Sequence, residues 1–270
     1  MSKIFDVKDK VMVITGGGGV LGRSMSEYMC EQGVKLAIVD RCREAGQKLE
    51  AELLAKGYPV KSFCADVLDK ESLEISSAEI IAEFGSIDIL VNAAGGNMPG
   101  ATIPPDKTIF DLELDAFKKV VDLNLFGTIL PTMVYAKEMV KQGKGSIINI
   151  SSESAIRPLT RVVGYGTSKA AVTNFTKYLA TELATKFGEG LRVNAMAPGF
   201  FLTEQNRALM TNPDGSLTAR GNSIIAHTPF GRFGSPDELC GTLHWLASDA
   251  SKFVTGTLTV IDGGFDVFCI

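Results

Sequence analysis

Short apolar runs recur along the chain, separated by longer stretches in which apolar residues follow a helical spacing. The apolar runs cover residues 11–14, 36–39, 60–65, 87–91, 146–150, 191–196 and 257–261. Such runs are typical of strands buried on both faces of a parallel sheet. Helical stretches follow at residues 21–33, 43–56, 70–84, 115–139, 164–187 and 236–247. The alternation predicts an α/β fold, a Rossmann-type doubly wound parallel sheet of about seven strands with helices on both faces. We expect residues 1–270 to form a single domain.

Residues 200–235 interrupt the alternation of strands and helices. They contain the turn signal Asn212-Pro213-Asp214-Gly215 and scattered polar side chains. This stretch follows the carboxyl end of a predicted strand, and long irregular loops in compact domains are usually functional or disordered. We therefore expect residues 200–235 to form an irregular substrate lid.

A run of glycines joins the first predicted strand to the first helix. The run reads Thr15-Gly16-Gly17-Gly18-Gly19-Val20-Leu21-Gly22, and the second strand ends at Asp40. Strand, glycine loop, helix, strand and terminal acid are the context that a dinucleotide-binding fingerprint requires. Glycines let the backbone approach a pyrophosphate, and the helix start offers free N–H groups and a positive dipole. We predict a dinucleotide site here.

Asp40 bears on which dinucleotide binds. A carboxylate at this position accepts hydrogen bonds from a ribose diol and repels a 2′-phosphate. The sequence therefore favours NAD over NADP. Arg41 follows directly, and an arginine there is able to accommodate the extra phosphate.

Tyr165 and Lys169 lie four positions apart at the start of a predicted helix. Residues at this spacing share one helix face. A phenol has an ordinary pKa of about 10, and a nearby cation lowers the pKa by favouring the phenolate. We expect Lys169 to lower the pKa of Tyr165, so that Tyr165 acts as a general acid or base.

Composition and charge exclude several classes of protein. The net charge is −4, whereas nucleic-acid-binding proteins usually carry a basic surface. No apolar run reaches the ~18 residues that cross a bilayer, and the charged start, Met1–Asp6, lacks the apolar core of a signal peptide. Five cysteines without a CxxC pair suit a reducing compartment better than a disulfide framework or a zinc site. We expect a cytoplasmic protein with no metal, membrane or nucleic-acid partner.

The motifs together resemble the short-chain dehydrogenase/reductase family over essentially the whole chain. Ser152 precedes Tyr165 by 13 positions (165 − 152), which is the family's spacing. Val20 is a departure, because the family usually has glycine there. The resemblance rests on Thr15-Gly16…Gly22, Asp66, Asn92-Ala93-Ala94-Gly95, Asn124, Ser152, Tyr165-x-x-x-Lys169 and Pro198-Gly199.

The resemblance implies a role for each matching residue. Tyr165 would exchange the proton of the reacting alcohol, Lys169 would lower its pKa and bind the nicotinamide ribose, and Ser152 would hydrogen-bond the reacting oxygen. Asn124 would hold a water that relays protons to Lys169. Asp66 is either an adenine ligand or the N-cap of the next helix. The predicted cofactor contacts are Gly16, Gly19, Val20, Leu21, Gly22, Asp40, Asp66, Val67, Asn92, Ala93, Ala94, Gly95, Tyr165, Lys169, Pro198, Gly199 and Thr203.

Three further stretches are similar to the sugar-acid oxidoreductases of this family, which interconvert D-mannonate and D-fructuronate. They are Ser154–Arg161, Pro198–Arg207 and His227–Arg232. Arginine pairs bidentately with carboxylates, so we expect at least one of Arg157, Arg161 and Arg207 to bind the substrate carboxylate. The substrate candidates are Ser152, Glu153, Arg157, Arg161, Gln205, Asn206 and Arg207, with Asn97 as a further hydroxyl ligand.

Two other functions stay open at this point. One is a short-chain enzyme for another substrate, such as gluconate 5-oxidation or reduction of a ketoacyl thioester. The other is a non-catalytic NAD-binding regulator. The resemblance also implies a homotetramer or homodimer, and the apolar stretch Phe265–Ile270 is expected either at a subunit contact or packed on its own subunit.

Overall fold

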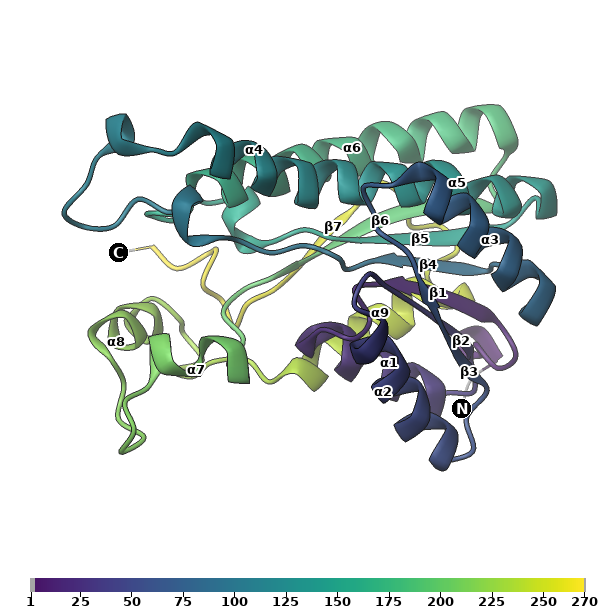
Figure 1. Ribbon diagram of the computed structural model, residues 1–270, viewed down its shortest axis with the longest axis horizontal. Helices are drawn as coiled ribbons and strands as arrows, with labels where there is room; N and C mark the ends of the chain where they lie inside the picture. The colour runs from purple at the N-terminus through teal and green to yellow at the C-terminus, as the bar shows by residue number, and fades with distance from the viewer. Residues whose placement is uncertain (1–2, 270) are drawn as a thin grey trace.

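The structure, a computed structural model, describes residues 3–269, and for residues 204 and 205 it describes the backbone alone. Within this range seven strands form one parallel sheet in the order β3-β2-β1-β4-β5-β6-β7 (Figure 1). The chain order reverses between β1 and β4, the point at which open α/β sheets bind ligands. The predicted fold class is confirmed. The strands are β1 (Val11–Thr15), β2 (Lys35–Asp40), β3 (Val60–Cys64), β4 (Ile89–Asn92), β5 (Gly145–Ile150), β6 (Leu191–Pro198) and β7 (Leu258–Ile261).

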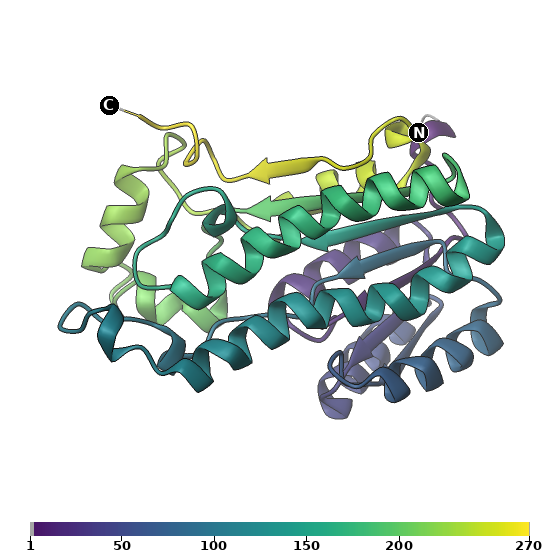
Figure 2. The same ribbon diagram turned by 90° about the horizontal axis from the view of Figure 1, so that it is seen from above.

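Helices cover both faces of the sheet (Figures 1 and 2). One face carries α1 (Val20–Glu31), α2 (Arg43–Ala55) and α9 (Cys240–Ala247), and the other carries α3 (Lys70–Phe84), α5 (Gly127–Gln142) and α6 (Val163–Phe187). Alternate residues of β1 supply both cores. Met12 and Ile14 pack on the first face, and Val11 and Val13 on the second. The continuous apolar runs of β1 and β2 arise because these strands are buried on both sides, whereas the edge strands β3 and β7 are more exposed.

The long helix expected over residues 115–139 is divided in two. It consists of α4 (Leu114–Val121), a π-helical turn at Asp122–Phe126, and α5. A π-turn inserts one extra residue into a helix, and such turns are frequent at functional sites. The apolar spacing on either side did not reveal this interruption.

The insertion at residues 200–235 is more regular than the sequence predicts. It contains α7 (Glu204–Met210) and α8 (Ala219–Ala226), which lie beyond the carboxyl ends of the strands (Figures 1 and 2). The prediction of an irregular stretch was wrong because polar side chains there cap helices. Thr203 and Asn206 form a capping box at α7, and the Thr218 hydroxyl accepts a hydrogen bond from Gly221 N at α8.

The segment that follows β7 packs on the rest of its own chain. Phe265 is 8% exposed, and its ring lies 5.1 Å from that of Phe200. Val267, in contrast, is 79% exposed. Ile270 belongs to the same predicted apolar stretch but lies outside the described residues.

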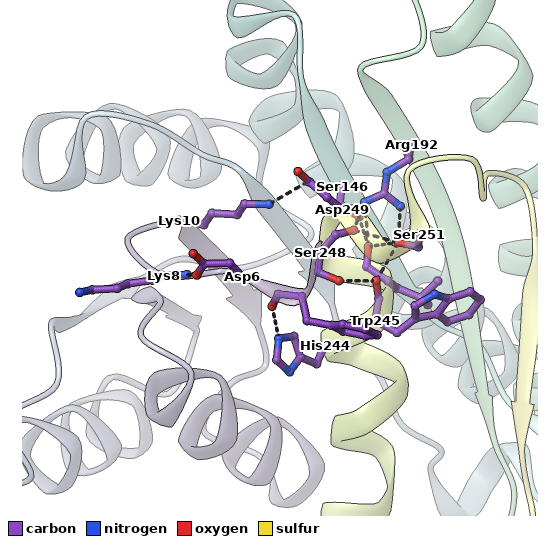
Figure 3. Close-up of polar contacts among 12 residues, drawn as sticks. Asp6, Lys8, Lys10, Ser146, Arg192, His244, Trp245, Ser248, Asp249 and Ser251 are labelled. Atoms are coloured by element: carbon purple, nitrogen blue, oxygen red, sulfur yellow. Dashed lines mark hydrogen bonds and ion pairs between the residues drawn. The ribbon is translucent and has the colours of Figure 1, made fainter. Parts of the chain in front are cut away.

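A buried arginine fastens the amino-terminal end of the sheet (Figure 3). Arg192 of β6 donates from Nη1 to Ser251 Oγ (2.9 Å), and from Nη2 to the carbonyls of Leu246 (2.9 Å) and Ser248 (3.2 Å). These carbonyls belong to the end of α9, where a cation is favourable to the helix dipole. None of the helices within residues 3–269 is both long enough and apolar enough to cross a membrane.

Candidate functional site

A cleft of about 450 Å³ runs across the carboxyl ends of the strands. Its wall includes the glycine loop, the ends of β2, β4, β5 and β6, and the first turn of α6. The predicted site residues that line it are Gly16, Gly19, Val20, Leu21, Gly22, Asp40, Val67, Ala93, Ala94, Gly95, Ser152, Tyr165, Pro198, Gly199, Thr203 and Asn206.

The glycine loop leaves room for a phosphate group. Gly16 has a φ of +65°, and a Cβ atom there would lie 2.8 Å from Ala94 Cα. At Gly22 a Cβ atom would lie 2.5 Å from the carbonyl oxygen of Gly16. Gly19 is the N-cap of α1, so no side chain caps the first amides, and the first turn holds no acidic residue. The loop therefore fits a pyrophosphate at the helix start. Val20 takes the first helical position, so this departure from the family pattern leaves the loop closely packed.

Asp40 lies at the end of β2, in the wall of the cleft. Its Oδ2 accepts a hydrogen bond from Gly18 N (3.2 Å), and its Oδ1 accepts one from Cys42 N (2.9 Å). The carboxylate is thus fixed against the glycine loop, where it fits a ribose diol. Arg41 also lines the cleft. The residue that favours NAD, Asp40, and the residue that is able to accommodate a 2′-phosphate, Arg41, therefore both lie in its wall.

Asp66 lies in a hollow that adjoins the cleft, since Arg41 and Ala65 line both. The N-cap of α3 is Asp69, whose side chain accepts a hydrogen bond from Glu71 N. Asp66 accepts from Leu68 N (2.9 Å) instead. The alternative that Asp66 caps α3 is therefore wrong, and its contact with adenine stays a prediction.

The Ser152, Tyr165 and Lys169 side chains meet between β5 and α6. Lys169 is 3% exposed, its Nζ donates to the Ile150 carbonyl (2.7 Å), and this nitrogen lies 5.6 Å from the centre of the Tyr165 ring. Burial lowers the pKa of Lys169 to about 8. Burial also raises the pKa of Tyr165, and a hydrogen bond with Ser152 opposes that rise.

The expected lowering of the Tyr165 pKa by Lys169 is thus not found in the protein alone. The two residues share a helix face, as predicted, but desolvation of the phenol raises its pKa, and the cause that opposes this rise is the hydrogen bond with Ser152. The sequence does not show how deeply a residue is buried, so it gave no measure of this opposing effect.

Asn124 lies in the π-turn and is fully buried. Its Nδ2 donates to the carbonyls of Gly96 (2.7 Å) and Val120 (2.8 Å), and its Oδ1 accepts from Gly96 N (3.1 Å). A Cβ atom at Gly95 would lie 2.7 Å from Asn124 Oδ1 and 3.3 Å from Lys169 Nζ. The π-turn therefore brings Asn124 to the glycines of the cleft, beside Lys169. Its water-holding role stays a prediction.

Asn92 is placed away from the cleft. Its side chain is buried and donates hydrogen bonds to Thr132 Oγ1 (2.9 Å) and Asn149 Oδ1 (2.8 Å). These contacts join β4, β5 and α5. Asn97 donates to Thr102 Oγ1 (2.9 Å) in an exposed loop.

The three candidate arginines occupy different places. Arg157 donates to the carbonyls of Phe265 (2.7 Å) and Phe268 (3.2 Å). Arg207 lines a separate hollow under α8. Arg161 is exposed on the loop between Ser152 and Tyr165, with a left-handed φ of +76°.

The polar substrate candidates also differ in their surroundings. Asn206 lines the cleft, but its side-chain amide is used to cap α7. Its Oδ1 accepts a hydrogen bond from Thr203 N (2.8 Å), and its Nδ2 donates to the Phe201 carbonyl (2.8 Å). Glu153 is 1% exposed, beneath the segment that follows β7. The side chain of Gln205 lies outside the described part of the structure.

Several residues of the site escaped the sequence reasoning. Some of them directly precede or follow predicted residues, so their position in the sequence could have indicated that they line the cleft. Arg220 on α8 had no such signal, because its proximity to Arg161 depends on the fold of the insertion. The missed cleft residues are Val39, Ala65, Leu123, Ile150, Ser151, Phe200 and Phe201.

Comparisons with known proteins agree with this geometry. A family model described as enoyl-(acyl carrier protein) reductase matches residues 19–266. An uncharacterized oxidoreductase of Bacillus subtilis, UxuB, is 44% identical over 95% of this chain and 94% of its own length.

Solved structures give the same picture. One from Haemophilus influenzae, provisionally named a D-mannonate oxidoreductase and containing bound NAD, is 39% identical with a TM-score of 0.91, over 98% of this chain and 97% of that chain. A gluconate 5-dehydrogenase from Burkholderia cenocepacia, in complex with NADP and tartrate, is 32% identical with a TM-score of 0.87, over 98% of both chains. The chain belongs to the short-chain dehydrogenase/reductase family and is an NAD(P)-dependent oxidoreductase that acts on alcohol and keto groups.

Proposed function

We propose that this enzyme uses NAD to interconvert a sugar acid and its keto form, with D-mannonate and D-fructuronate as the first candidates. The observation that carries the substrate class is a pair of arginines, Arg161 on the loop before α6 and Arg220 on α8, which are near enough for the charge of Arg161 to act on Arg220. Neither is among the described residues that line the cleft. The relative with bound NAD and the D-mannonate name supports the same proposal.

Arg161 precedes Tyr165 by four residues (165 − 161), and its carbonyl accepts a hydrogen bond from Ile103 N (2.9 Å). Arg220 lies in the first turn of α8, which contains no acidic residue. Burial and then the positive charge of Arg161 lower the pKa of Arg220. The described side chains include no carboxylate in an ion pair with either arginine. Two arginines that repel each other without an acid between them favour a carboxylate ligand.

The chain's own residues suit the oxidation of an alcohol. NAD, when bound, supplies the acceptor for the hydride. Tyr165 would take the hydroxyl proton as general base, and Ser152 would hydrogen-bond the same oxygen and stabilise its developing charge. Lys169, held by the Ile150 carbonyl, would contact the nicotinamide ribose. Asp40 would hold the adenosine ribose, and the amides at Gly19–Gly22 would hold the pyrophosphate.

The first test measures NADH formation with a panel of aldonic acids, D-mannonate first and D-gluconate second, each with NAD and with NADP. Turnover of D-mannonate with NAD and little with NADP is the expected result. Turnover of D-gluconate alone would favour the second candidate, gluconate 5-oxidation, which the Burkholderia relative supports. Activity on a neutral alcohol and on no aldonate would overturn the sugar-acid proposal.

The arginine pair is tested by Arg161→Gln and Arg220→Gln. Each change removes a charged hydrogen-bond donor worth about 1.5–3 kcal/mol, so KM for the aldonate should rise roughly 10- to 100-fold. KM for the matching sugar alcohol, which has no carboxylate, should stay the same. Arg232→Gln is the matched control, since Arg232 pairs with Glu238. Equal KM changes for the acid and the alcohol would show that neither arginine binds the carboxylate.

A further inference from the structure

Glu153 is a buried carboxyl group that the proposed reaction does not use. It directly follows Ser152 in a short 3-10 turn, Glu153–Ala155, and it is 1% exposed. Neither Oε1 nor Oε2 has a hydrogen-bond partner among the described atoms. A buried carboxylate without a partner is very costly, whereas the neutral acid costs much less. The position therefore favours the protonated form.

The charged groups around Glu153 strengthen this preference. Burial, then Asp266 and Asp262, raise its pKa to about 7, and Arg157 acts in the opposite direction. The Arg157 guanidinium donates to the carbonyls of Phe265 and Phe268, and it makes no hydrogen bond with Glu153. Asp262 is itself engaged, accepting from Gly264 N (2.8 Å) and Asp266 N (2.6 Å).

The two aspartates belong to residues Asp262–Phe268, here named the post-β7 segment. This segment joins the loop of Ser152 to the base of the lid. Arg157 fixes it on the Ser152 side, by the two hydrogen bonds above and by lying 5.7 Å from the Phe265 ring. On the lid side, His227 lies 6.4 Å from the Phe265 ring and 6.2 Å from the Phe268 ring.

The same segment also supports the wall of the cleft. Phe200, which lines the cleft, packs edge-on against Phe265 at 5.1 Å. A Cβ atom at Gly199 would lie 2.6 Å from Asp262 Cβ, so the segment is closely packed against the end of β6. Any movement of the segment would therefore reach both Ser152 and Phe200.

We propose that Glu153 is a positioning residue that holds the post-β7 segment against the Ser152 loop only while its carboxyl group is protonated. Ionisation places a third negative charge beside Asp262 and Asp266, on a carboxyl group that has no hydrogen-bond partner among the described atoms. The segment then loosens, and the wall formed by Phe200 loosens with it. The enzyme thus carries a proton-controlled contact beside its active site, independent of Tyr165.

The direction of the pH effect follows from the raised pKa. A carboxyl group whose pKa is raised on folding stabilises the fold at low pH, and this contribution is lost as the pH rises to its folded value, about 7 here. Each pH unit between the ordinary carboxyl pKa and this value should favour the loosened state by up to a factor of roughly ten, and the effect should level off above it.

Native-state hydrogen exchange on peptides from residues 262–269 tests the proposal without a substrate. We compare the wild type with Glu153→Gln, which keeps the shape of the neutral acid. The two proteins should exchange alike at about pH 4.5, and the wild type should exchange at least about tenfold faster at about pH 8.5. Glu189→Gln, an exposed change far from the segment, is the matched control and should follow the wild type.

Asp266→Asn is the second variant. It removes one of the charges that oppose ionised Glu153, so the rise in exchange at high pH should become smaller than in the wild type. Equal exchange by the wild type and Glu153→Gln at both pH values would overturn the proposal. Fast exchange by Glu153→Gln at both values would also overturn it, because the side chain would then be structural in any protonation state.

A kinetic measurement connects the contact to the active site. With any alcohol that the enzyme oxidises, KM of the wild type should rise as the pH approaches neutrality and then level off, and Glu153→Gln should not show this rise. The proposal does not depend on the substrate being a sugar acid, so failure of the aldonate panel leaves it intact. A KM that follows the same pH curve in both proteins would overturn it.

Discussion

Arg192 and Glu153 are both buried ionisable residues, and they lie at opposite ends of the sheet. Arg192, at the amino-terminal end, is 9% exposed and donates to two carbonyls and one hydroxyl (Figure 3). Glu153, at the carboxyl end, is 1% exposed and has no hydrogen-bond partner among the described atoms. Arg192 thus has hydrogen-bond partners for its guanidinium, whereas Glu153 has none among the described atoms for its carboxyl group.

This difference separates groups that stabilise the fold from groups that are available for function. A buried charge with all its hydrogen bonds stabilises the fold. If that side chain is removed, its buried partners lose those hydrogen bonds and each bears a desolvation penalty. Unsatisfied groups destabilise a fold, and they are concentrated at functional sites. The carboxyl end holds Glu153, which has no hydrogen-bond partner among the described atoms, and Lys169, whose pKa is lowered. It also holds the like-charged Arg161 and Arg220.

The largest expected effect is on catalysis, from Tyr165→Phe. The change removes the proposed proton-transferring hydroxyl, so kcat should fall by about 10²–10⁴. The free energy of unfolding and the affinity for the dinucleotide should change little, because the ring still fills its place. Turnover assays and dinucleotide titration check this. A variant with wild-type kcat would contradict the proposed role, and a non-catalytic regulator would lose no function.

The next effect is on stability, from Arg192→Leu. The carbonyls of Leu246 and Ser248 would each lose a charged hydrogen bond worth about 1.5–3 kcal/mol, although Ser146 Oγ and Ser251 Oγ would still donate to the Leu246 carbonyl. Urea unfolding should therefore show a protein roughly 3 kcal/mol less stable, with an unchanged KM in the folded fraction. A large change in KM at unchanged stability would mean that the two ends of the sheet do not divide these roles.

The smallest effect is expected for Lys10→Gln, which lies in the same part of the fold. Lys10 forms an ion pair with Asp249 at 3.3 Å, and the aspartate side chain is 73% exposed (Figure 3). Exposed pairs contribute less than about 1 kcal/mol because water and salt screen them. A loss as large as that of Arg192→Leu would show that burial does not decide the contribution of these charges.

The architecture could be predicted from the sequence because the central strands are buried on both faces. Val11–Ile14 and Leu36–Val39 are continuous apolar runs, and a glycine loop and a helically spaced segment lie between them. The insertion at residues 200–235 was predicted less well. Thr203 and Thr218 look like loop residues in the sequence, yet each caps a helix. A capping residue and a loop residue have the same chemistry, and the helix that each one caps is too short to show a clear period.

The candidate site was predictable where a motif fixes a backbone position. The glycine loop, Asp40, Ser152 and Tyr165 all lie in the wall of the cleft. Prediction was poorest for properties that depend on burial and on distant segments. This class includes the raised pKa of Tyr165 and the hydrogen bond from Arg157 to the carbonyl of Phe265. It also includes the effect of the Arg161 charge on the pKa of Arg220.

The π-turn at Asp122–Phe126 also has a consequence for the phase of the helical surface. Each residue turns a helix by roughly 100°, so one inserted residue rotates everything after it by that angle. The faces that α4 and α5 present are therefore out of step, and Asn124 lies at the join. A deletion of one residue here would restore a regular helix, and it would rotate Tyr135 and Met139 out of the core that they now fill. The alignment of the whole of α5 with the core thus depends on the same π-turn that places Asn124 against Gly96.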